Sequence, residues 1–264
     1  KFQTECESCF FLKSKGKDLS TSVFDKKMSL YKDANITFVG CSRWLSGRAK
    51  KSYLLRGKAV LSIPNPIDTK VYHPMDQGMA RELLGLPSGK RLLLFGALNV
   101  TDKRKGIDYL IEALRRMEKQ DVELVVFGQV KDDIRGLFPV PIHSMGYLSD
   151  ESKIVALYNA VDMFITSSLE ENLPNTIMES MACGTPCVGF EIGGIPEMID
   201  HRVNGYVANY KDAGDLANGI QWVLEHEDRL ALSDACVKKV QENYTEEVVA
   251  KQYTALYEKL LKGE

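Results

Sequence analysis

Two glutamates, Glu171 and Glu179, lie around the start of a predicted helix with seven residues between them. Pro174 is expected at the first helical position and Gly184 just past the last one, because proline suits a helix start and glycine a helix end. The free N–H groups and the positive dipole end of such a helix favour an anion. The helix start is therefore a candidate anion site, although solvated surface helices also carry glutamates at this spacing.

A basic run, Lys103-Arg104-Lys105, is the second candidate. It follows an apolar strand that ends in Gly96 and comes directly before Gly106 and a predicted helix. Loops between strands and helices of an open α/β protein bind ligands at the carboxyl edge of the sheet. Guanidinium and ammonium groups placed there suit phosphate oxygens. The alternative is a solvated basic loop, which is the commoner role of such a run.

Short apolar strands and helices alternate from Arg91 onward and must position these residues. Strands that are apolar throughout indicate a parallel sheet covered by helices on both faces. The predicted fold class is therefore α/β, a doubly wound parallel sheet of the Rossmann-like type with right-handed crossovers. Strands are expected at 92–95, 122–127, 142–145, 163–166 and 186–190, and helices at 107–117, 151–160, 174–183, 195–199, 215–226, 227–242 and 245–262.

The first third of the chain carries a smaller pattern. A helix is expected near 23–31, followed by a strand at 36–41, a helix at 43–55 capped by Ser42, and a strand at 59–63. Pro64 and Pro66 end that strand because proline removes ladder donors. A domain boundary is predicted near Asp68, giving an incomplete first domain at 1–68, a ligand-binding domain at 69–245 and a last helix at 246–264. The apolar stripe of that helix packs across onto the first domain or covers its own.

Composition narrows the class of protein. A chain of 264 residues with 44% hydrophobic and 27% charged residues is ordinary for a globular protein of one or two domains. Its net charge of −2 gives no reason to expect nucleic acid as a partner. No apolar run approaches the roughly 18 residues of a membrane span. The chain begins at Lys1 without methionine, so a piece of a longer protein is expected.

Six cysteines are present, and only Cys6 and Cys9 have the spacing of a metal-ligand pair. A tetrahedral zinc site needs four ligands, and neither a second pair nor a nearby histidine follows. Reduced thiols in a cytoplasmic protein are the favoured interpretation, and half of a metal or disulfide site is the alternative. Cys183 and Cys187 are expected at a helix end and in an apolar strand, as small hydrophobic residues.

Four elements in close order carry a family resemblance: Glu171-x7-Glu179, Ala182-Cys183-Gly184-Thr185-Pro186, Gly193-Gly194-Ile195-Pro196-Glu197 and Asn204-Gly205. Together they resemble the donor-binding half of the retaining glycosyltransferases of family four, the group 1 transferases. The resemblance runs from about Ile36 to the C-terminus. It implies the C-terminal domain of a GT-B architecture, and an N-terminal acceptor domain of which residues 1–68 are the trailing part.

The resemblance also implies an activity. A retaining transferase of this family moves a hexose from a UDP- or GDP-sugar donor to a glycan or lipid-linked acceptor, here in polysaccharide biosynthesis. The acceptor is expected on the N-terminal domain, and peripheral membrane association of the full protein is compatible with a lipid-linked acceptor. No cofactor is expected besides the nucleotide-sugar substrate.

Matched residue by residue, the resemblance implies roles for the candidates. Lys105 corresponds to the lysine that binds the diphosphate, whereas Ala97 stands where an arginine after Gly96 is typical, so that Arg104 is the expected substitute. Glu179 corresponds to the carboxylate that holds the ribose hydroxyls, and Glu171 to the one that faces the hexose. The base is expected at Gly146 and Tyr147, and backbone N–H groups and short polar side chains for sugar and phosphate come from Asn172, Leu173, Pro174, Asn175 and Thr176. One departure is Pro66, where the family's linker has glycine.

Other classes of protein fit less well. The chain contains no Asp-x-Asp pair for a divalent ion, so metal-independent transfer is expected. Gly96 is not followed by the G-x-G-x-x-G set of a dehydrogenase. The four histidines share no motif with a nucleophile, so a hydrolase triad has no support and no general base is named. A pyridoxal lysine motif for a phosphorylase is not visible. A nucleotide-sugar binding module without transfer, or an epimerase of the same architecture, stays open.

Overall fold

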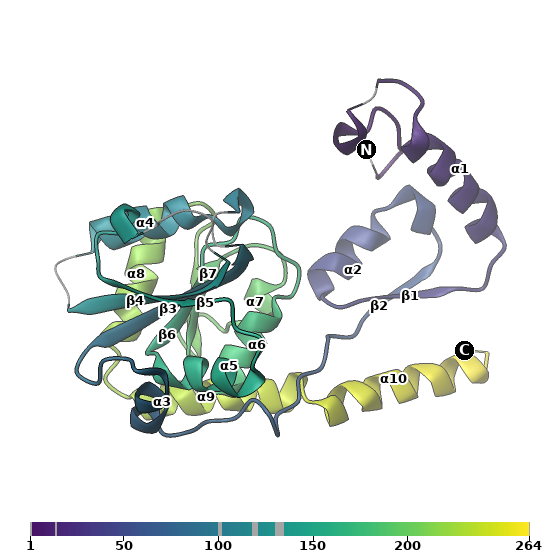
Figure 1. The fold of residues 1–264 in the computed structure, drawn as a ribbon. Coiled ribbons are helices and arrows are strands. Elements are labelled where there is room, and N and C mark those ends of the chain that lie inside the picture. The colour runs from purple at the N-terminus through teal and green to yellow at the C-terminus, as the bar shows by residue number, and fades with distance from the viewer. Residues whose placement is uncertain (1, 14, 100–101, 118–120, 130–134, 264) are drawn as a thin grey trace. The chain divides into compact units, whose positions relative to one another are not determined.

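A computed structural model describes residues 2–13, 15–99, 102–117, 121–129 and 135–263 of the chain (Figure 1). The chain divides into two compact units, Lys1–Pro64 and Asn65–Glu264. The division falls inside the segment Pro64–Asp68. Ile67 already belongs to the second unit, because its backbone N–H donates to the Tyr244 carbonyl at 2.8 Å and it forms a parallel bridge with Thr245.

The first unit is built on a two-stranded parallel sheet of β1 (Thr37–Gly40) and β2 (Ala59–Ser62), connected through α2 (Arg43–Lys50). Ser42 caps α2 as predicted, accepting from the Leu45 N–H at 3.0 Å. The helix predicted to run to residue 55 ends at Lys50, and a separate 3₁₀ turn, η2 (Tyr53–Leu55), follows. Packing explains this break, because the Tyr53 ring of η2 stacks on Phe24 with ring centroids 6.2 Å apart.

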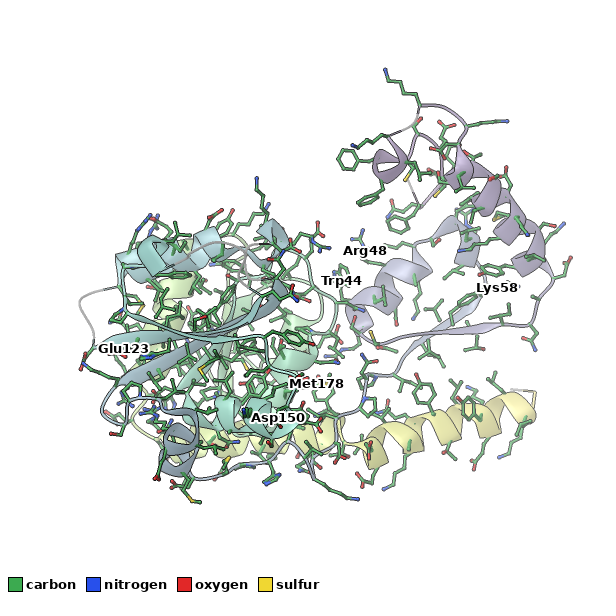
Figure 2. The ribbon with its side chains drawn as sticks, viewed as in Figure 1. Trp44, Arg48, Lys58, Glu123, Asp150 and Met178 are labelled. Carbon is green, nitrogen blue, oxygen red and sulfur yellow. The ribbon has the colours of Figure 1, made fainter. Side chains whose placement is uncertain are left out.

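Two further elements precede this sheet, the 3₁₀ turn η1 (Phe10–Leu12) and α1 (Leu19–Lys32). The helix begins four residues earlier than predicted because Asp18 caps it, with its Oδ1 accepting from the Ser20 N–H at 2.8 Å. On α2, the Arg48 guanidinium lies 5.3 Å from the centre of the Trp44 ring (Figure 2). Such cation–π contacts hold long side chains on a half-exposed surface.

The second unit follows the predicted alternation of strands and helices. Its strands are β3 (Arg91–Asn99), β4 (Val122–Gln129), β5 (Ile142–Gly146), β6 (Met163–Thr166), β7 (Cys187–Phe190) and β8 (Gly205–Ala208). Its helices are α3 (Gln77–Leu84), α4 (Ile107–Arg116), α5 (Glu151–Ala160), α6 (Asn175–Ala182), α7 (Ile195–Met198), α8 (Ala213–Leu224), α9 (Arg229–Asn243) and α10 (Glu246–Leu261), with the 3₁₀ turns η3 (Lys103–Lys105) and η4 (Arg135–Leu137) between them.

The six strands form one parallel sheet in the order β5-β4-β3-β6-β7-β8. Helices α4 and α8 pack together on one face, and α3, α5, α6 and α9 pack on the other (Figure 1). The predicted doubly wound α/β fold is therefore confirmed. Chain order reverses between the neighbouring strands β3 and β6, and such a switch point is where open α/β sheets bind ligands.

Both faces of the sheet are buried beneath helices and shielded from solvent. Leu92, Leu93 and Leu94 of β3 alternate between the two faces, and all three side chains are fully buried. This explains why the strand is apolar throughout instead of alternating with polar residues. A rigid sheet of this kind fixes the ends of β3 and β6, and therefore the loops that follow them.

Several element boundaries differ from the sequence-based expectation. Pro174 is the N-cap of α6 and not its first helical residue, with φ −69° and ψ 118°. Helix α3 and strand β8 were not predicted, because Gly78 and Gly205 lower the local propensity for regular structure. Asp76 nevertheless caps α3, accepting from the Met79 N–H at 2.8 Å. Capping and tertiary packing outweigh propensity at these two places.

The amino edge of the sheet is held by a buried carboxylate. Asp162 precedes β6 and is 3% exposed. Its oxygens accept from the Leu92 N–H at 2.6 Å and pair with Arg81 at 3.1 Å and Arg229 at 2.5 Å. These contacts join α3, β3, β6 and α9. Loss of any one partner would leave charge on the buried carboxylate less well compensated, which is costly.

Candidate functional site

Three loops meet at the carboxyl edge of the sheet, next to the switch point. The first leads from β3 through η3 into α4, the second from β6 to α6, and the third from β7 to α7. Residues 100 and 101 of the first loop lie outside the described part of the chain. The loops carry most of the predicted site residues, and the following contacts show how they are joined.

Backbone contacts attach the first loop to the second. The Leu169 N–H donates to the Arg104 carbonyl at 2.7 Å, and the Ser167 hydroxyl donates to the Lys105 carbonyl at 3.0 Å. Gly106 permits this approach: its φ is +64°, and a Cβ there would lie 2.0 Å from the Ser167 carbonyl oxygen. Glycine is therefore required at this position by both conformation and space.

Lys105 and Glu171 form an ion pair across these two loops, with 2.5 Å between Nζ and Oε1. Their side chains are 33% and 15% exposed, so the pair is partly shielded from water. The two residues are 66 positions apart in the chain and meet because β3 and β6 are neighbours. The structure thus brings together two of the residues predicted to be catalytic.

Arg104 lies on the same turn but is held differently. Its side chain is 69% exposed and pairs with Asp102, at 2.7 Å between Nη2 and Oδ2. The hydrogen bonds from Arg104 lower the pKa of the Asp102 carboxyl to about 2. Arg104 is therefore an exposed cation that is held by a carboxylate. An anionic ligand has to compete with Asp102 for its guanidinium.

The third loop fixes the backbone on either side of Glu171. The Gly194 N–H donates to the Asn172 carbonyl at 2.5 Å. Gly193 has φ +60°, and a Cβ there would lie 2.0 Å from the Glu171 carbonyl oxygen. The Gly193-Gly194 pair, noted in the sequence only as part of a motif, thus positions the glutamate loop. A pair of glycines directly before a helix is a signal that could have revealed this role.

Helix α6 opens from this loop. Leu173 is buried at 7% exposure and anchors the loop, whereas Asn175 is exposed and Thr176 half-buried. The N-cap Pro174 offers no side-chain oxygen to the first N–H groups of the helix. An N-terminus of this kind favours an anion. It lies in the same loop as Glu171 and hence beside the Lys105 ion pair.

Glu179 projects from α6 into a mostly buried environment. Its Oε2 accepts a hydrogen bond from the Tyr158 hydroxyl of α5 at 2.8 Å. Burial raises the pKa of Glu179 above its ordinary value, the Tyr158 hydrogen bond opposes that effect, and the nearby Glu151 adds to it. Burial and Glu179 together hold the pKa of Tyr158 well above its usual range, so the phenol stays protonated and donates.

Tyr72 extends this group. It follows the linker, and burial together with the charges of the nearby Glu179 and Glu151 raises its pKa. Two carboxylates and two phenols thus gather where α5 and α6 pack against the segment after the linker. Sequence analysis named only Glu179 in this group, because the helix packing that adds the other three residues leaves no local pattern.

Gly96 and the Gly146-Tyr147 pair lie toward the β5 side of the same edge. A Cβ at Gly96 would lie 1.8 Å from the ring of Phe127, and that ring packs edge-on against Tyr158 with centroids 6.2 Å apart. Gly96 therefore makes room for Phe127, and any further role toward a ligand stays a prediction. Gly146 ends β5 with φ +63°, and Tyr147 is 61% exposed.

Metal and thiol chemistry find little support in the described residues. Across the described ranges, no three side chains of His, Cys, Asp or Glu form a group that could hold a metal ion. All six cysteines are free thiols. Cys183 caps the end of α6 and Cys187 begins β7, as predicted, and burial raises the pKa of each thiol to about 12. These two cysteines are unreactive parts of the core.

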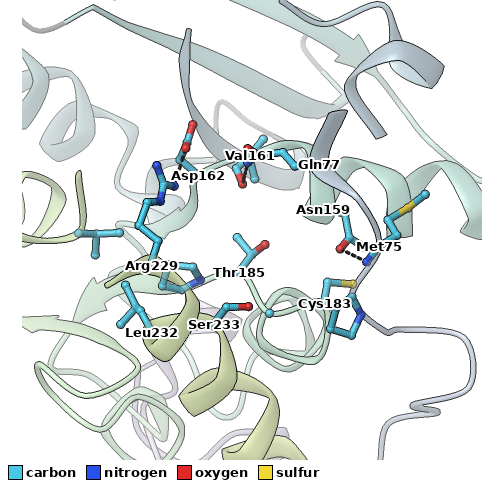
Figure 3. Close-up of a pocket in the computed structure, with 14 residues that line it drawn as sticks. Met75, Gln77, Asn159, Val161, Asp162, Cys183, Thr185, Arg229, Leu232 and Ser233 are labelled. Atoms are coloured by element: carbon cyan, nitrogen blue, oxygen red, sulfur yellow. Dashed lines mark hydrogen bonds and ion pairs between the residues drawn. The ribbon is translucent and has the colours of Figure 1, made fainter. Parts of the chain in front are cut away.

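A separate pocket of about 320 Å³ lies at the opposite, amino edge of the sheet (Figure 3). Asn159, Asp162, Thr185 and Arg229 are among its lining residues, and its Asn159 side chain accepts from the Met75 N–H at 2.8 Å. None of the predicted site residues lines this pocket. Two of its lining residues, Asp162 and Arg229, form the ion pair that helps to hold the amino edge together.

Comparison with known proteins bears on these observations. The sequence model of the family described as "Glycosyl transferases group 1" matches residues 89–226, which is more than half of the chain and includes all three loops. The chain belongs to this family. The family assignment made from the glutamate and glycine motifs is therefore confirmed.

Individual relatives agree with this assignment. The N-acetyl-alpha-D-glucosaminyl L-malate synthase of Bacillus anthracis is 24% identical over 213 residues, 78% of this chain and 55% of the relative. The chain thus spans only about half the length of that relative. Sucrose-phosphate synthase from Thermosynechococcus elongatus has a similar fold, with a TM-score of 0.77 and 21% identity over 100% of this chain and 65% of that one.

A second similar structure is Anabaena HepE in complex with UDP-glucose, with a TM-score of 0.70 and 19% identity over 89% of this chain and 67% of that one. At these identities the two structures establish only the fold, which is that of the GT-B class. No helix in the described parts of the chain is both long and apolar enough to cross a membrane.

Proposed function

We propose that residues 65–264 are the donor-binding part of a retaining glycosyltransferase that transfers a hexose from a UDP- or GDP-sugar. The observation that carries the proposal is the Lys105–Glu171 ion pair at the switch point of the sheet, beside the open start of α6. A diphosphate donor needs cations and N–H donors for its phosphates and a carboxylate near its sugar. The three loops supply these groups within one edge of the sheet.

Breaking the bond between sugar and phosphate leaves negative charge on the diphosphate. Only groups that bind this charge more strongly in the transition state than in the ground state accelerate the step. Lys105 and the start of α6 lie on neighbouring loops, and Lys105 exchanges its ion pair with Glu171 for the diphosphate when the donor binds. Arg104 adds a guanidinium once the diphosphate replaces Asp102 as its partner, and it takes the place of the arginine absent at Ala97.

Glu171 faces the other side of the breaking bond. With Lys105 drawn to the diphosphate, its carboxylate is released toward the sugar, where it stabilises positive charge at the anomeric carbon. We attribute the retention of anomeric configuration to a front-face route, in which the leaving diphosphate accepts the proton of the acceptor hydroxyl. No general base from this chain is needed for that route. Asn172, Asn175 and Thr176 add short polar groups for the hexose and the phosphates.

Glu179 binds the ribose in this proposal. A carboxylate accepts one hydrogen bond from each hydroxyl of a vicinal diol, and Tyr158 holds the Glu179 carboxylate in place from behind. The base lies toward Gly146 and Tyr147 at the end of β5. The UDP-glucose bound to the similar Anabaena structure supports uridine as the first nucleotide to test.

The remaining parts of the proposal concern the whole protein. The acceptor, a glycan or lipid-linked sugar in polysaccharide biosynthesis, binds on the side of the N-terminal domain. Transfer proceeds without a metal ion, because Lys105, Arg104 and the α6 start supply the positive charge. The protein works in the cytoplasm, where nucleotide sugars are available.

Calorimetric titration of the 264-residue chain tests the proposal. The ligands are UDP, GDP and ADP and their glucose and mannose conjugates, and the buffer contains EDTA. Saturable binding of one uridine or guanosine series, with the Lys105→Ala variant binding more weakly, is the expected result. Equal, unsaturable responses to all nucleotides would overturn it. Lys103→Ala is the matched control, because Lys103 lies on the same turn and is exposed.

A further inference from the structure

A further loop at the carboxyl edge of the sheet contacts the candidate site. This loop, residues 209–212, connects β8 to α8, and its residues have no role in the proposed function. Because β6, β7 and β8 are parallel, it leaves the sheet on the same edge as the β6–α6 loop. Its Tyr210 hydroxyl donates a hydrogen bond to the Leu169 carbonyl of the β6–α6 loop at 3.0 Å, although the two residues are 41 positions apart.

Packing holds the Tyr210 ring in the orientation that makes this bond. In the sheet β7 lies between β6 and β8, so the side chain crosses the end of β7 to reach Leu169. Phe190, the last residue of β7, is fully buried and meets the Tyr210 ring edge-on, with centroids 6.4 Å apart. The Lys211 ammonium lies 5.1 Å from the centre of the same ring. The tyrosine is therefore held by its ring as well as by its hydroxyl.

The backbone that carries Tyr210 is itself anchored. Asp215 of α8 accepts from the Tyr206 hydroxyl at 2.8 Å through Oδ1, and from the Asn209 N–H at 2.7 Å through Oδ2. The Asp212 N–H closes the turn by donating to the Asn209 carbonyl at 3.1 Å. Tyr210 thus projects from a turn that is tied to both β8 and α8, and it can support a neighbouring loop.

The supported segment carries Glu171. The Leu169 N–H is bonded to the first loop, and the Leu169 carbonyl accepts from Tyr210, so this residue is held on both sides. Glu171 follows two positions later. On the far side of the glutamate, the Asn172 carbonyl accepts from the Gly194 N–H of the third loop. The segment 169–172 is therefore restrained at both ends, and Tyr210 contributes to the restraint at its first residue.

We propose that Tyr210 is a positioning residue, whose hydroxyl fixes the backbone before Glu171 and so holds the Glu171 carboxylate where the hexose of the donor meets it. The meeting with the hexose rests on the proposed function, whereas the restraint on the loop does not. One hydroxyl-to-carbonyl hydrogen bond changes an equilibrium by about two- to tenfold, and this is the size of effect expected.

Hydrogen–deuterium exchange of the ligand-free 264-residue chain tests the restraint without a donor. Tyr210→Phe removes the hydroxyl and keeps the ring contacts. The Leu169 amide should exchange about two- to tenfold faster in this variant, because the loop opens more often. Exchange at Gly194 should stay unchanged, and so should both sites in the control Tyr257→Phe, whose ring is 57% exposed on α10. Unchanged exchange at Leu169 in Tyr210→Phe would overturn the proposal.

A double-mutant cycle tests whether Tyr210 acts through Glu171. Calorimetry gives the ratio of affinities for UDP-glucose and UDP, and for GDP-mannose and GDP, in the parent chain, Tyr210→Phe, Glu171→Gln and the double variant. Tyr210→Phe should lower the sugar-dependent ratio about two- to tenfold. The double variant should match Glu171→Gln, since a positioning residue has no effect once the group it positions is gone.

The outcomes separate the two proposals. A ratio that Tyr210→Phe leaves unchanged, or losses that simply add in the double variant, would overturn the positioning role even if exchange at Leu169 rises. A parent chain that binds none of the four ligands refutes the proposed function and with it the contact to the hexose. The exchange result for the loop holds in that case, because it is measured without ligand.

Discussion

Replacing Tyr158 with phenylalanine isolates the hydrogen bond that positions Glu179. The substitution removes one hydroxyl and keeps the ring that packs on Phe127 and Phe164. Glu179 then loses the donor at 2.8 Å that favours its ionised form, whereas burial and Glu151 continue to favour the neutral form. The pKa of Glu179 therefore rises further, and the ribose meets a carboxyl group that more often carries a proton.

The magnitude follows from the kind of bond removed. A hydrogen bond to a charged group contributes about 1.5–3 kcal/mol, and each 1.4 kcal/mol is a factor of ten in affinity. UDP binding should therefore weaken by at most about 10- to 100-fold. The loss should be larger at pH 6 than at pH 8, because less of the variant's Glu179 is ionised at the lower pH.

Calorimetry with UDP and 2′-deoxy-UDP at the two pH values measures this effect. The parent chain should prefer UDP, Glu179→Gln should lose most of that preference, and Tyr158→Phe should lose it mainly at pH 6. Tyr257→Phe is the control, because its ring is 57% exposed on α10. If Glu179→Gln abolishes the preference for UDP over 2′-deoxy-UDP, but Tyr158→Phe leaves that preference unchanged, the positioning role of Tyr158 is refuted.

Three other substitutions test the site. Lys105→Ala should weaken UDP binding by about 1–3 kcal/mol, with Lys103→Ala unchanged; equal affinities for the two variants would reject the assignment of Lys105. Glu179→Gln should raise the melting temperature at neutral pH, because a carboxyl whose folded pKa is raised costs stability as pH rises above its ordinary value of 4.5. That gain should vanish in acid, and a gain of equal size at all pH values would contradict it. Gly106→Ala should destabilise the fold by about 2–4 kcal/mol, since it combines a positive φ with overpacking against Ser167. Gly89→Ala, where a Cβ meets nothing within 4 Å, is its control, and matching melting curves for the two variants would show that the loops tolerate a side chain there.

The sequence was most informative where local pattern and burial agree. Helix α5 has the predicted bounds, and β6 likewise, because an apolar run with a capping aspartate leaves little choice. Boundaries moved where tertiary contacts decide them. Tyr53 breaks the helix predicted through residue 55 by stacking on Phe24, and no glycine or proline between 51 and 55 announces that break.

The candidate site shows the same division. The rule that ligands bind after the strands of an open sheet placed Lys105 and Glu171 at one edge. Their ion pair depends on β3 lying next to β6, a neighbour relation that the chain order does not reveal. Tyr158 and Glu179 come from two helices packed together, so no spacing predicts their hydrogen bond.

A crystal structure of the chain with UDP tests the central claim most directly. The account predicts the diphosphate within hydrogen-bonding distance of the Lys105 ammonium and the N–H groups that open α6, with the ribose hydroxyls on Glu179. Uridine seated elsewhere, for example in the amino-edge pocket beside Arg229, or a ribose turned away from Glu179, would contradict it.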